Sequence, residues 1–246
     1  MYRAWLQASP ADPVAAHLVS STSGENQPPR SSNGFIESVF GRAAPDFDAT
    51  LTTLNYRAPQ LLFESAMAIL DPSVVGLEIL DLGCGTGLCA QWFRPLASRI
   101  VGVDLAPEML AQARARGCYD ELICEEITAF ATRCSQRFDL ITAADVLCYF
   151  GDLSVLLEAV ASLLYPGGLF VYSVEELPSE LSSSIHRNGY ELLEHGRYAH
   201  SAPYLRRVMN HVGLPAVVVS QAVLRLERGS PVRGLLSSAR RPGVVR

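Results

Sequence analysis

The sequence contains no lysine: all twenty of its basic residues are arginine, and twenty-five acidic residues outnumber them. This absence excludes a lysine Schiff base and a lysine general base. The net charge of −5 argues against a nucleic-acid partner, because nucleic-acid binders usually carry a basic face. No apolar run reaches the roughly 18–20 residues that a membrane-spanning helix requires, and the first residues lack the apolar segment of a secretory signal. We therefore expect a cytoplasmic protein with no membrane partner.

Cysteine pairs at metal-site or redox spacing are also missing. The six cysteines are scattered and none forms a C-x-x-C pair, so zinc and dithiol chemistry lack support and we predict no metal. We expect reduced thiols, most of them acting as small buried apolar groups. With 49% hydrophobic and 18% charged residues, the composition is that of a globular protein with a substantial core. The sequence gives no indication of the oligomeric state.

Composition divides the chain into three parts. We interpret residues 1–33 as an N-terminal helical remnant and a flexible linker, since residues 21–33 are rich in Ser, Pro and Asn and contain almost nothing apolar. Residues 34–72 carry apolar side chains at helical spacing and are predicted to form two or three helices. From residue 73 to 246 the hydrophobic pattern changes its period, which indicates a separate main domain.

Strands alternate with helices through most of the main domain. The strands are almost continuously apolar, which is typical of a parallel sheet that helices cover on both faces, so we predict a doubly wound α/β fold. A Gly229-Ser230-Pro231 turn joins two late strands, which are therefore predicted to be antiparallel. The predicted strands are 77–82, 99–105, 121–126, 138–145, 169–175, 190–195, 216–227 and 232–240, and the predicted helices are about 87–96, 107–117, 153–164 and 201–213.

Three glycines interrupt the apolar pattern in "ILDLGCGTG", where Gly83, Gly85 and Gly87 occupy every second position. Glycine weakens a strand or helix interior by roughly 0.5–1 kcal/mol, so we interpret this stretch as a sharp turn that a ligand approaches closely. A strand that enters such a turn and then a helix exposes backbone N–H groups. Asp104 closes the next strand and can accept hydrogen bonds from both hydroxyls of a ribose. The pattern predicts a nucleotide-like cofactor.

Two cofactor classes fit this layout. A dinucleotide requires G-x-G-x-x-G, with its pyrophosphate at the helix N-terminus. Here the pattern is G-x-G-x-G, and Leu88 stands in the place of the third glycine. Asp81, just before the turn, is poorly suited to face a pyrophosphate. S-adenosylmethionine has no phosphate and carries a sulfonium and an ammonium, so an acidic residue is tolerated there. These departures favour S-adenosylmethionine.

The motifs "ILDLGCGTG", "GVDLAPEML", "FDLITAADVLCYF" and "YPGGLF" occur in the order and spacing of class I S-adenosylmethionine-dependent methyltransferases. The chain resembles that family over about residues 75–175. The resemblance implies a mostly parallel, seven-stranded Rossmann-like sheet with its last strand antiparallel. Three further stretches resemble bacterial tetratricopeptide-repeat-associated methyltransferases: "FIESVFGRAAPDFDATLTTLNYRAP", "GRYAHS" and "YRAWLQASPADPVAAHL".

The resemblance implies a set of cofactor-binding residues. Asp104 would hold the ribose hydroxyls, Leu105 would pack on the adenine, and Glu126 would lie near the adenine amino group. Ala144 and Asp145 would close the site near the methyl group. The residues expected to line the methionine part are Asp81, Gly83, Gly85 and Gly87.

The segment "EHGRYAHS" (194–201) concentrates aromatic, cationic and titratable groups before a predicted helix. We predict that it is a loop facing the transferable methyl group. His200 is the candidate general base, Tyr198 a candidate catalytic or acceptor-binding residue, and Arg197 a candidate pocket residue. We expect residues 34–72 to form a helical lid over the site. The lid residues expected to face cofactor or acceptor are Phe47, Tyr56 and Arg57.

Together these patterns predict methyl transfer to a small-molecule or carrier-bound acceptor, at an oxygen, a nitrogen or an acidic carbon. One alternative is a protein or nucleic-acid methyltransferase, which the negative charge and the lack of an Asn-Pro-Pro-Tyr motif disfavour. The other alternative is a catalytically silent S-adenosylmethionine-binding module that serves in protein interactions. Turnover with an acceptor distinguishes an enzyme from the silent module.

Overall fold

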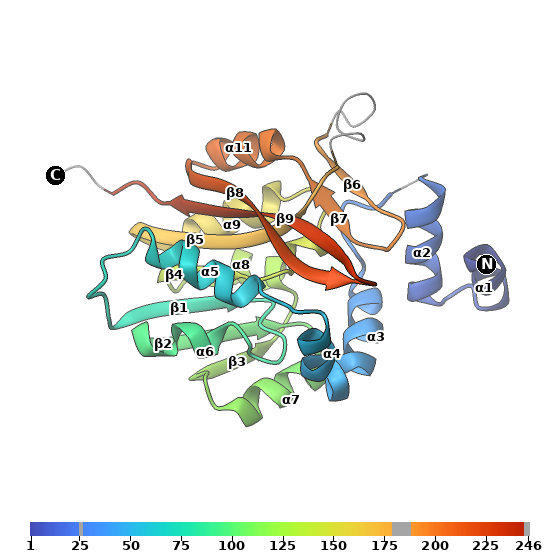
Figure 1. The fold of residues 1–246 in the computed structure, drawn as a ribbon, viewed down its shortest axis with the longest axis horizontal. Coiled ribbons are helices and arrows are strands. Elements are labelled where there is room, and N and C mark those ends of the chain that lie inside the picture. Colours follow the sequence, from blue (N-terminus) through green and yellow to red (C-terminus); the bar gives the residue numbers. More distant parts are fainter. Residues whose placement is uncertain (25–26, 179–187, 244–246) are drawn as a thin grey trace.

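A nine-stranded sheet forms the centre of the computed structural model, which describes residues 1–24, 27–178 and 188–243 (Figure 1). Seven strands follow the order β3-β2-β1-β4-β5-β9-β8, and β9 runs antiparallel to both of its neighbours. The predicted mostly parallel α/β sheet with a late antiparallel strand is confirmed. The strands are β1 (Leu77–Leu82), β2 (Ala97–Asp104), β3 (Glu121–Cys124), β4 (Phe138–Ala143), β5 (Leu164–Glu176), β6 (Tyr190–Leu192), β7 (Tyr198–His200), β8 (Ala216–Glu227) and β9 (Ser230–Arg240).

Two short strands extend this sheet beyond the end of β4. β7 pairs in parallel with Glu175 and Glu176 at the end of β5, and β6 pairs antiparallel with β7. The loop predicted over residues 194–201 is therefore wrong for residues 198–200, which form β7. A strand of three residues is too short for the alternation of apolar and polar side chains to reveal it.

Helices cover both faces of the sheet. One hydrophobic cluster joins α5 and α6 to the sheet, and a larger cluster joins α8, α9 and α11 to its other face. The sequence did not predict α8, which has only seven residues and is too short for a helical period to stand out. The helices that follow the N-terminal region are α5 (Ala58–Met67), α6 (Ala90–Phe93), η2 (Arg94–Leu96), α7 (Pro107–Arg116), α8 (Ile127–Arg133), η3 (Leu147–Tyr149), α9 (Ser154–Leu163) and α11 (Ala202–His211).

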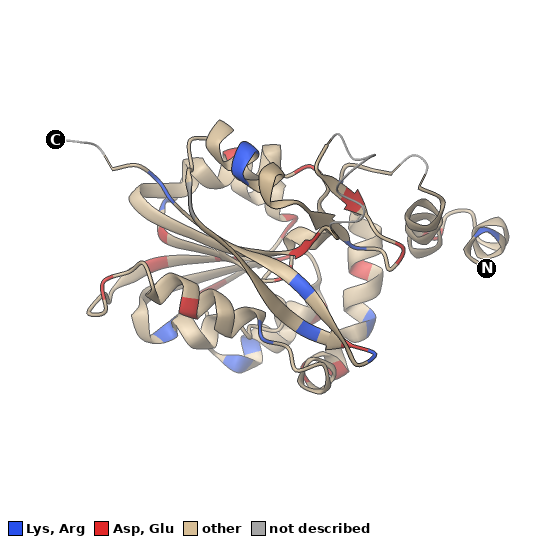
Figure 2. Ribbon diagram, turned by 45° about the horizontal axis from the view of Figure 1, so that its top comes forward, with Lys and Arg blue, Asp and Glu red and all other residues tan. Residues whose placement is uncertain are grey.

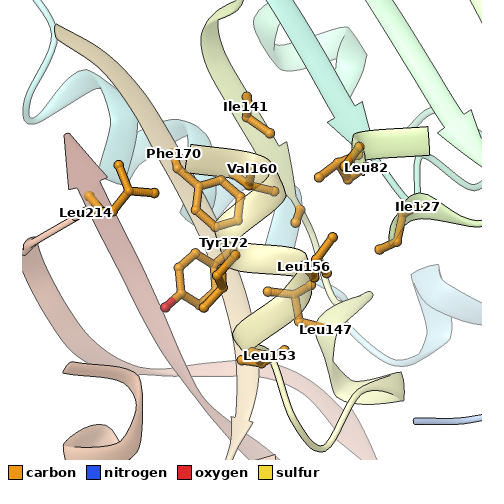
Figure 3. Close-up of a cluster of buried hydrophobic side chains, with 14 of the residues drawn as sticks. Leu82, Ile127, Ile141, Leu147, Leu153, Leu156, Val160, Phe170, Tyr172 and Leu214 are labelled. Atoms are coloured by element: carbon orange, nitrogen blue, oxygen red, sulfur yellow. The ribbon is translucent and has the colours of Figure 1, made fainter. Parts of the chain in front are cut away.

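Part of the larger core cluster lies between β5 and α9 (Figure 3). Phe170 and Tyr172 point from β5 to the same face of the sheet, because residues two apart in a strand share a face. Their rings stack with centroids 4.7 Å apart. Leu156 and Val160 of α9 lie beside them and are buried (Figure 3). This packing fixes β5, the strand that borders β4, β7 and β9.

The N-terminal region packs against the domain at several points. Gln27 exchanges two hydrogen bonds with the backbone of Leu192, and the N–H of Ser31 donates to the carbonyl of Tyr149 at 2.8 Å. These contacts contrast with the flexible linker predicted over residues 21–33, of which residues 25–26 lie outside the described part. The helices of this region are α1 (Tyr2–Ala8), α2 (Pro13–Ser23), α3 (Asn33–Ala43), η1 (Ala44–Asp46) and α4 (Phe47–Thr53).

The segment predicted as a lid divides into two parts. α3 and α4 lie side by side at the edge of the sheet where β1 ends (Figure 1). α5 instead packs on the sheet, with Ala58, Leu62 and Ala66 fully buried. Only α3, η1 and α4 can therefore act as a lid. Basic and acidic residues are interspersed over the whole ribbon and do not gather by sign (Figure 2).

Candidate functional site

A cavity of about 390 Å³ lies between the carboxyl ends of β1, β2 and β4 and the helices α3, η1 and α4. Ligands of doubly wound sheets bind at this edge, and the volume falls within the roughly 300–1,000 Å³ of small-molecule sites. The three helices give the cavity a largely apolar roof. Its apolar members are Ile36, Val39, Phe40, Ala43, Phe47 and Leu51, and Leu54 adjoins them just after α4.

The turn after β1 forms the floor of the cavity. Gly83 and Gly85 both line it, with φ angles of +66° and +53° in the left-handed region. A Cβ at Gly83 would lie 2.3 Å from the side chain of Val146, whereas a Cβ at Gly85 would meet nothing within 4 Å. Gly83 is therefore required by packing within the protein. Gly85 leaves open space in which a ligand can approach the backbone.

Asp104 holds the turn in place and also lines the cavity. Its Oδ2 accepts a hydrogen bond from the Gly85 N–H at 2.8 Å, and its Oδ1 accepts one from the Ala106 N–H at 2.9 Å. A carboxylate has about four acceptor sites, so acceptor capacity remains for a ligand beside the backbone N–H groups of Gly85, Leu105 and Ala106. Burial raises the pKa of Asp104 above its ordinary value. The neighbouring Leu105 lines the cavity too, in the place predicted for the adenine.

Two residues predicted to line the methionine part of the cofactor are not among the described residues of the cavity wall. Asp81 is 2% exposed and accepts hydrogen bonds from the Tyr119 hydroxyl at 2.7 Å and the Thr142 hydroxyl at 2.8 Å. Burial raises the pKa of Asp81 to about 6. A Cβ at Gly87 would lie 2.9 Å from the Tyr119 ring. Asp81 and Gly87 therefore support the turn from behind.

Three more predicted cofactor residues line the cavity: Glu126, Ala144 and Asp145. Glu126 has a structural role as well, because its carboxylate accepts hydrogen bonds from the N–H groups of Thr128 and Ala129, both at 3.0 Å, and so caps α8. Asp145 follows β4 with a φ of +56°, a conformation that a non-glycine residue adopts only at a cost. The contacts of its carboxylate are described below.

α4 contacts the glycine turn directly. Asp48 accepts a hydrogen bond from the Thr86 hydroxyl at 2.6 Å and forms an ion pair with Arg116. The Arg116 Nε in turn donates to the Thr86 carbonyl at 2.8 Å. These three residues join the roof of the cavity to its floor.

The three predicted lid residues occupy different positions. Phe47 and Tyr56 line the cavity, as expected. Burial raises the pKa of Tyr56 well above its ordinary value, and the nearby Asp145 raises it further. Arg57 is exposed and absent from the described wall, and its backbone N–H donates to the Leu224 carbonyl at 2.8 Å. The prediction that Arg57 faces cofactor or acceptor is therefore wrong.

A cluster of five charged residues forms another part of the wall. Arg225, 4% exposed, donates to Asp145 at 2.6 Å, to Glu227 at 2.7 Å and to Glu175. The Nε of Arg197 donates to Glu175 at 2.5 Å, and its Nη2 donates to Glu227 at 2.7 Å. All members except Glu175 line the cavity. We call these five residues the charged cluster.

His200 and Tyr198 lie in the core and outside the described cavity wall. Both residues are 0% exposed. The Nε2 of His200 lies 3.1 Å from the Gly151 carbonyl, the ring stacks on Tyr204, and burial lowers its pKa to about 4. The Tyr198 hydroxyl donates to the Pro28 carbonyl. The prediction of a base and an aromatic group facing the methyl group is therefore corrected. Arg197, from the same segment, does line the cavity.

Several wall residues were missed by the sequence analysis. Arg225 and Glu227 lie on a correctly predicted strand, and their signal was a charge inside the apolar run "AVLRLE", since a charge buried there needs a partner. Tyr149 and Phe150 follow β4 in and after η3, where no periodic pattern marks them. Thr86 lies within the glycine motif itself.

Residues 46–219 match a protein family described as methyltransferase domain. The chain belongs to this family. A curated relative, a ubiquinone biosynthesis O-methyltransferase from Xanthomonas axonopodis pv. citri (strain 306), is 30% identical over 127 residues, which cover 50% of this chain and 52% of the relative. The chain thus spans about half the length of the curated relatives it matches.

Solved structures share the fold of this chain. The 1,6-didemethyltoxoflavin-N1-methyltransferase of Burkholderia thailandensis, solved with its acceptor and S-adenosylhomocysteine, has a TM-score of 0.64 and 19% identity and covers 84% of this chain and 87% of its own. The N-methyltransferase NodS of Bradyrhizobium japonicum WM9, solved with S-adenosylhomocysteine, has a TM-score of 0.62 and 18% identity, with 84% and 98% covered. At these identities the likeness shows the fold.

Within residues 1–24, 27–178 and 188–243, no helix combines the length and apolar character needed to cross a bilayer. In the same ranges no group of three or more His, Cys, Asp or Glu side chains is arranged to hold a metal ion.

Proposed function

We propose that this chain is an S-adenosylmethionine-dependent methyltransferase that acts on a small-molecule or carrier-bound acceptor. The observation that carries the proposal is the open space over Gly85, next to the partly unused Asp104 carboxylate, at the carboxyl edge of a methyltransferase-family sheet. S-adenosylmethionine is the cofactor, and when bound it supplies a methyl group that its sulfonium makes electrophilic.

The residues of the floor fit the parts of such a cofactor. The open space over Gly85 admits a close approach, Asp104 retains acceptor capacity for a ribose hydroxyl, and Leu105 offers an apolar surface to the adenine. Glu126 lies at the same cavity with its oxygens engaged at the α8 N-terminus. These roles follow from the family resemblance and remain proposals.

The roof positions the acceptor and excludes water. The apolar side chains of α3 and α4 face the floor across a cavity of about 390 Å³. Their main contribution is to hold the acceptor atom in line with the methyl group, because positioning is the largest part of catalysis when the donor is already reactive. His200 has no place in this scheme, since its ring lies in the core.

The test is calorimetric. S-adenosylhomocysteine should bind 1:1 in the micromolar range, and NAD should not bind, because Leu88 stands in the place of the third glycine of the dinucleotide pattern. Tight binding of NAD without binding of S-adenosylhomocysteine would overturn the proposal. Binding of S-adenosylhomocysteine without turnover on any acceptor would favour the silent binding module.

The finer resemblance to tetratricopeptide-repeat-associated methyltransferases is also a proposal. It is supported by α1 and α2, two short helices that contact each other at one end of the long dimension of the molecule (Figure 1). We also propose that the protein is cytoplasmic.

A further inference from the structure

The charged cluster gives one part of the cavity wall an unequal number of opposite charges. Three carboxylates, those of Asp145, Glu175 and Glu227, face the two guanidinium groups of Arg197 and Arg225. Five nitrogen atoms of the two arginines donate hydrogen bonds to these carboxylates. They are Nε, Nη1 and Nη2 of Arg225, and Nε and Nη2 of Arg197. When all three carboxylates are ionised, one negative charge is left over.

The groups nearest the cluster do not cancel this excess. His195 Nε2 lies 3.3 Å from Glu175, but burial lowers the pKa of His195, so the ring is neutral at pH 7. Tyr56 and Tyr149 line the same cavity and are neutral too, because burial raises the pKa of each phenol. The excess negative charge therefore lies in a partly buried site, where water screens it less than it would at the protein surface.

Two further arginines line the cavity from the lid side. Arg42 is exposed to solvent, and Arg30 donates its Nη1 to the Ser31 carbonyl and the Asn33 side chain. Solvent screens a charge at such a rim, so it contributes less than a buried one. The buried part of the wall is the part that discriminates between charged ligands.

Asp145 has two properties that point to a ligand. Its backbone holds a φ of +56°, and strained conformations of this kind cluster at functional sites. Its Oδ2 is paired with Arg225, but its Oδ1 is buried and has no hydrogen-bond partner in the described part of the chain. A buried acceptor without a donor is costly, and Asp145 lines the cavity, where a ligand can supply that donor.

We propose that the methyl acceptor is an amine, whose N–H groups and positive charge are matched by the excess carboxylate of the charged cluster. The inference rests on the proposed function. In the reaction the nitrogen gives a proton to a cluster carboxylate or to water, and its lone pair forms the new N–C bond. The electron pair of the broken S–C bond stays on sulfur as a thioether.

An anionic acceptor is a poor fit to this wall. A carboxylate or phosphate would need a guanidinium free to receive it, and both cluster arginines are already shared among three carboxylates. A neutral alcohol or phenol could donate one hydrogen bond but would leave the excess charge unmatched. An amine supplies both the donor and the charge.

The experiment uses three probes of nearly equal size and different charge: benzylamine, benzyl alcohol and benzoate. Each is titrated into the full chain saturated with S-adenosylhomocysteine, with binding followed by calorimetry. We expect benzylamine to bind at least tenfold more tightly than benzyl alcohol, and benzoate to bind most weakly. Benzoate binding as tightly as benzylamine, or no benzylamine binding to the loaded protein, would overturn the inference.

Glu227→Gln provides the matched change, because it removes the excess charge while preserving the size of the side chain. Its carboxylate is one-third exposed, so the variant can fold. The benzylamine preference should fall to less than about threefold in Glu227→Gln and should be unchanged in Glu158→Gln, an exposed glutamate of α9 outside the described wall. A preference retained in Glu227→Gln contradicts the assignment to the cluster.

The two proposals fail differently. If S-adenosylhomocysteine does not bind, the proposed function fails before any amine is tested. If S-adenosylhomocysteine binds and the loaded protein ignores the charge of the probe, only the acceptor class is wrong.

Discussion

The glycine turn and the charged cluster both face the cavity, yet the chain builds them in different ways. The turn consists of residues 83–88, with Asp104 from the adjacent strand closing it. The cluster draws Asp145 from the segment just after β4, Glu175 from β5, Arg197 from the residue just before β7, and Arg225 with Glu227 from β8. A local turn can be recognised in the sequence, whereas a cluster of this kind exists only once the sheet order is known.

The two regions also differ in what they leave unoccupied. At the turn, a Cβ on Gly85 would meet no atom within 4 Å. At the cluster, nearly every charged atom has a partner, and one Asp145 oxygen is left without any among the described residues. The turn is thus shaped to admit a ligand close to its backbone. The charged cluster is suited to attract a ligand by its charge. Changes at the turn should affect ligand binding first, and changes at the cluster should affect folding first.

The largest effect on binding is expected from Gly85→Val. The new side chain would fill the open space over the turn, so calorimetry should detect no S-adenosylhomocysteine binding to a protein that still unfolds cooperatively. The matched control is Gly76→Val, because Gly76 also has a positive φ, of +80°, and open space around it, but it lies outside the described cavity wall. Both variants carry a similar backbone strain of about 1–3 kcal/mol.

If Gly85→Val bound S-adenosylhomocysteine as tightly as Gly76→Val does, the space over the turn would not be a ligand site. The glycine turn would then no longer differ from the charged cluster in offering open space to a ligand. Gly83→Val cannot replace this test, because a Cβ there would lie 2.3 Å from Val146 and would disturb folding itself.

The sequence was sufficient for the turn because its information is local. A strand, three glycines and an acidic residue at the end of the next strand define a ligand edge, and Gly83, Gly85 and Asp104 line the cavity. The sequence could not say which side of the turn faces the ligand. Asp81 and Gly87 belong to the same motif, but Tyr119 lies against both of them on the other side.

The error at "GRYAHS" has a geometric cause. Residues two apart in a strand share a face, so β7 sends Tyr198 and His200 to the same side, where both are buried. Arg197 has the opposite parity and reaches Glu175 and Glu227 of the charged cluster. Once residues 198–200 are known to form a strand, it follows that Arg197 lies on the opposite side from Tyr198 and His200. The composition of residues 194–201 alone does not predict this difference in side.

The largest effect on stability is expected from Arg225→Met. Removing one partner of a buried ionic network leaves uncompensated charges, which costs about 3–5 kcal/mol, and Arg225 contacts three carboxylates while only 4% exposed. Denaturant unfolding should measure this loss. The control Arg233→Met changes an exposed arginine on β9 and should stay within about 0.5 kcal/mol of the wild type. Equal stability of the two variants would show that the cluster does not support the fold.

A smaller effect is expected at the turn from Asp104→Ala. Hydrogen bonds to a charged group contribute about 1.5–3 kcal/mol, and this carboxylate both holds the Gly85 N–H and is available to a ribose. S-adenosylhomocysteine affinity should fall by that amount in calorimetry. Asp104→Asn keeps one acceptor oxygen and should lose less. An unchanged affinity in Asp104→Ala would mean that the carboxylate serves the turn alone.

The smallest effect is expected from Tyr198→Phe, which tests the corrected part of the site. The Tyr198 hydroxyl donates to the Pro28 carbonyl and its ring is fully buried, so the variant should lose about 0.5–1.5 kcal/mol of unfolding free energy, the net value of one hydrogen bond. S-adenosylhomocysteine affinity and benzylamine binding should stay unchanged, because the hydroxyl lies outside the described cavity wall. A fall in benzylamine binding of tenfold or more, with stability preserved, would return Tyr198 to the acceptor site. The unfolding free energy and the benzylamine affinity of Tyr198→Phe therefore decide together whether Tyr198 supports the sheet or takes part in acceptor recognition.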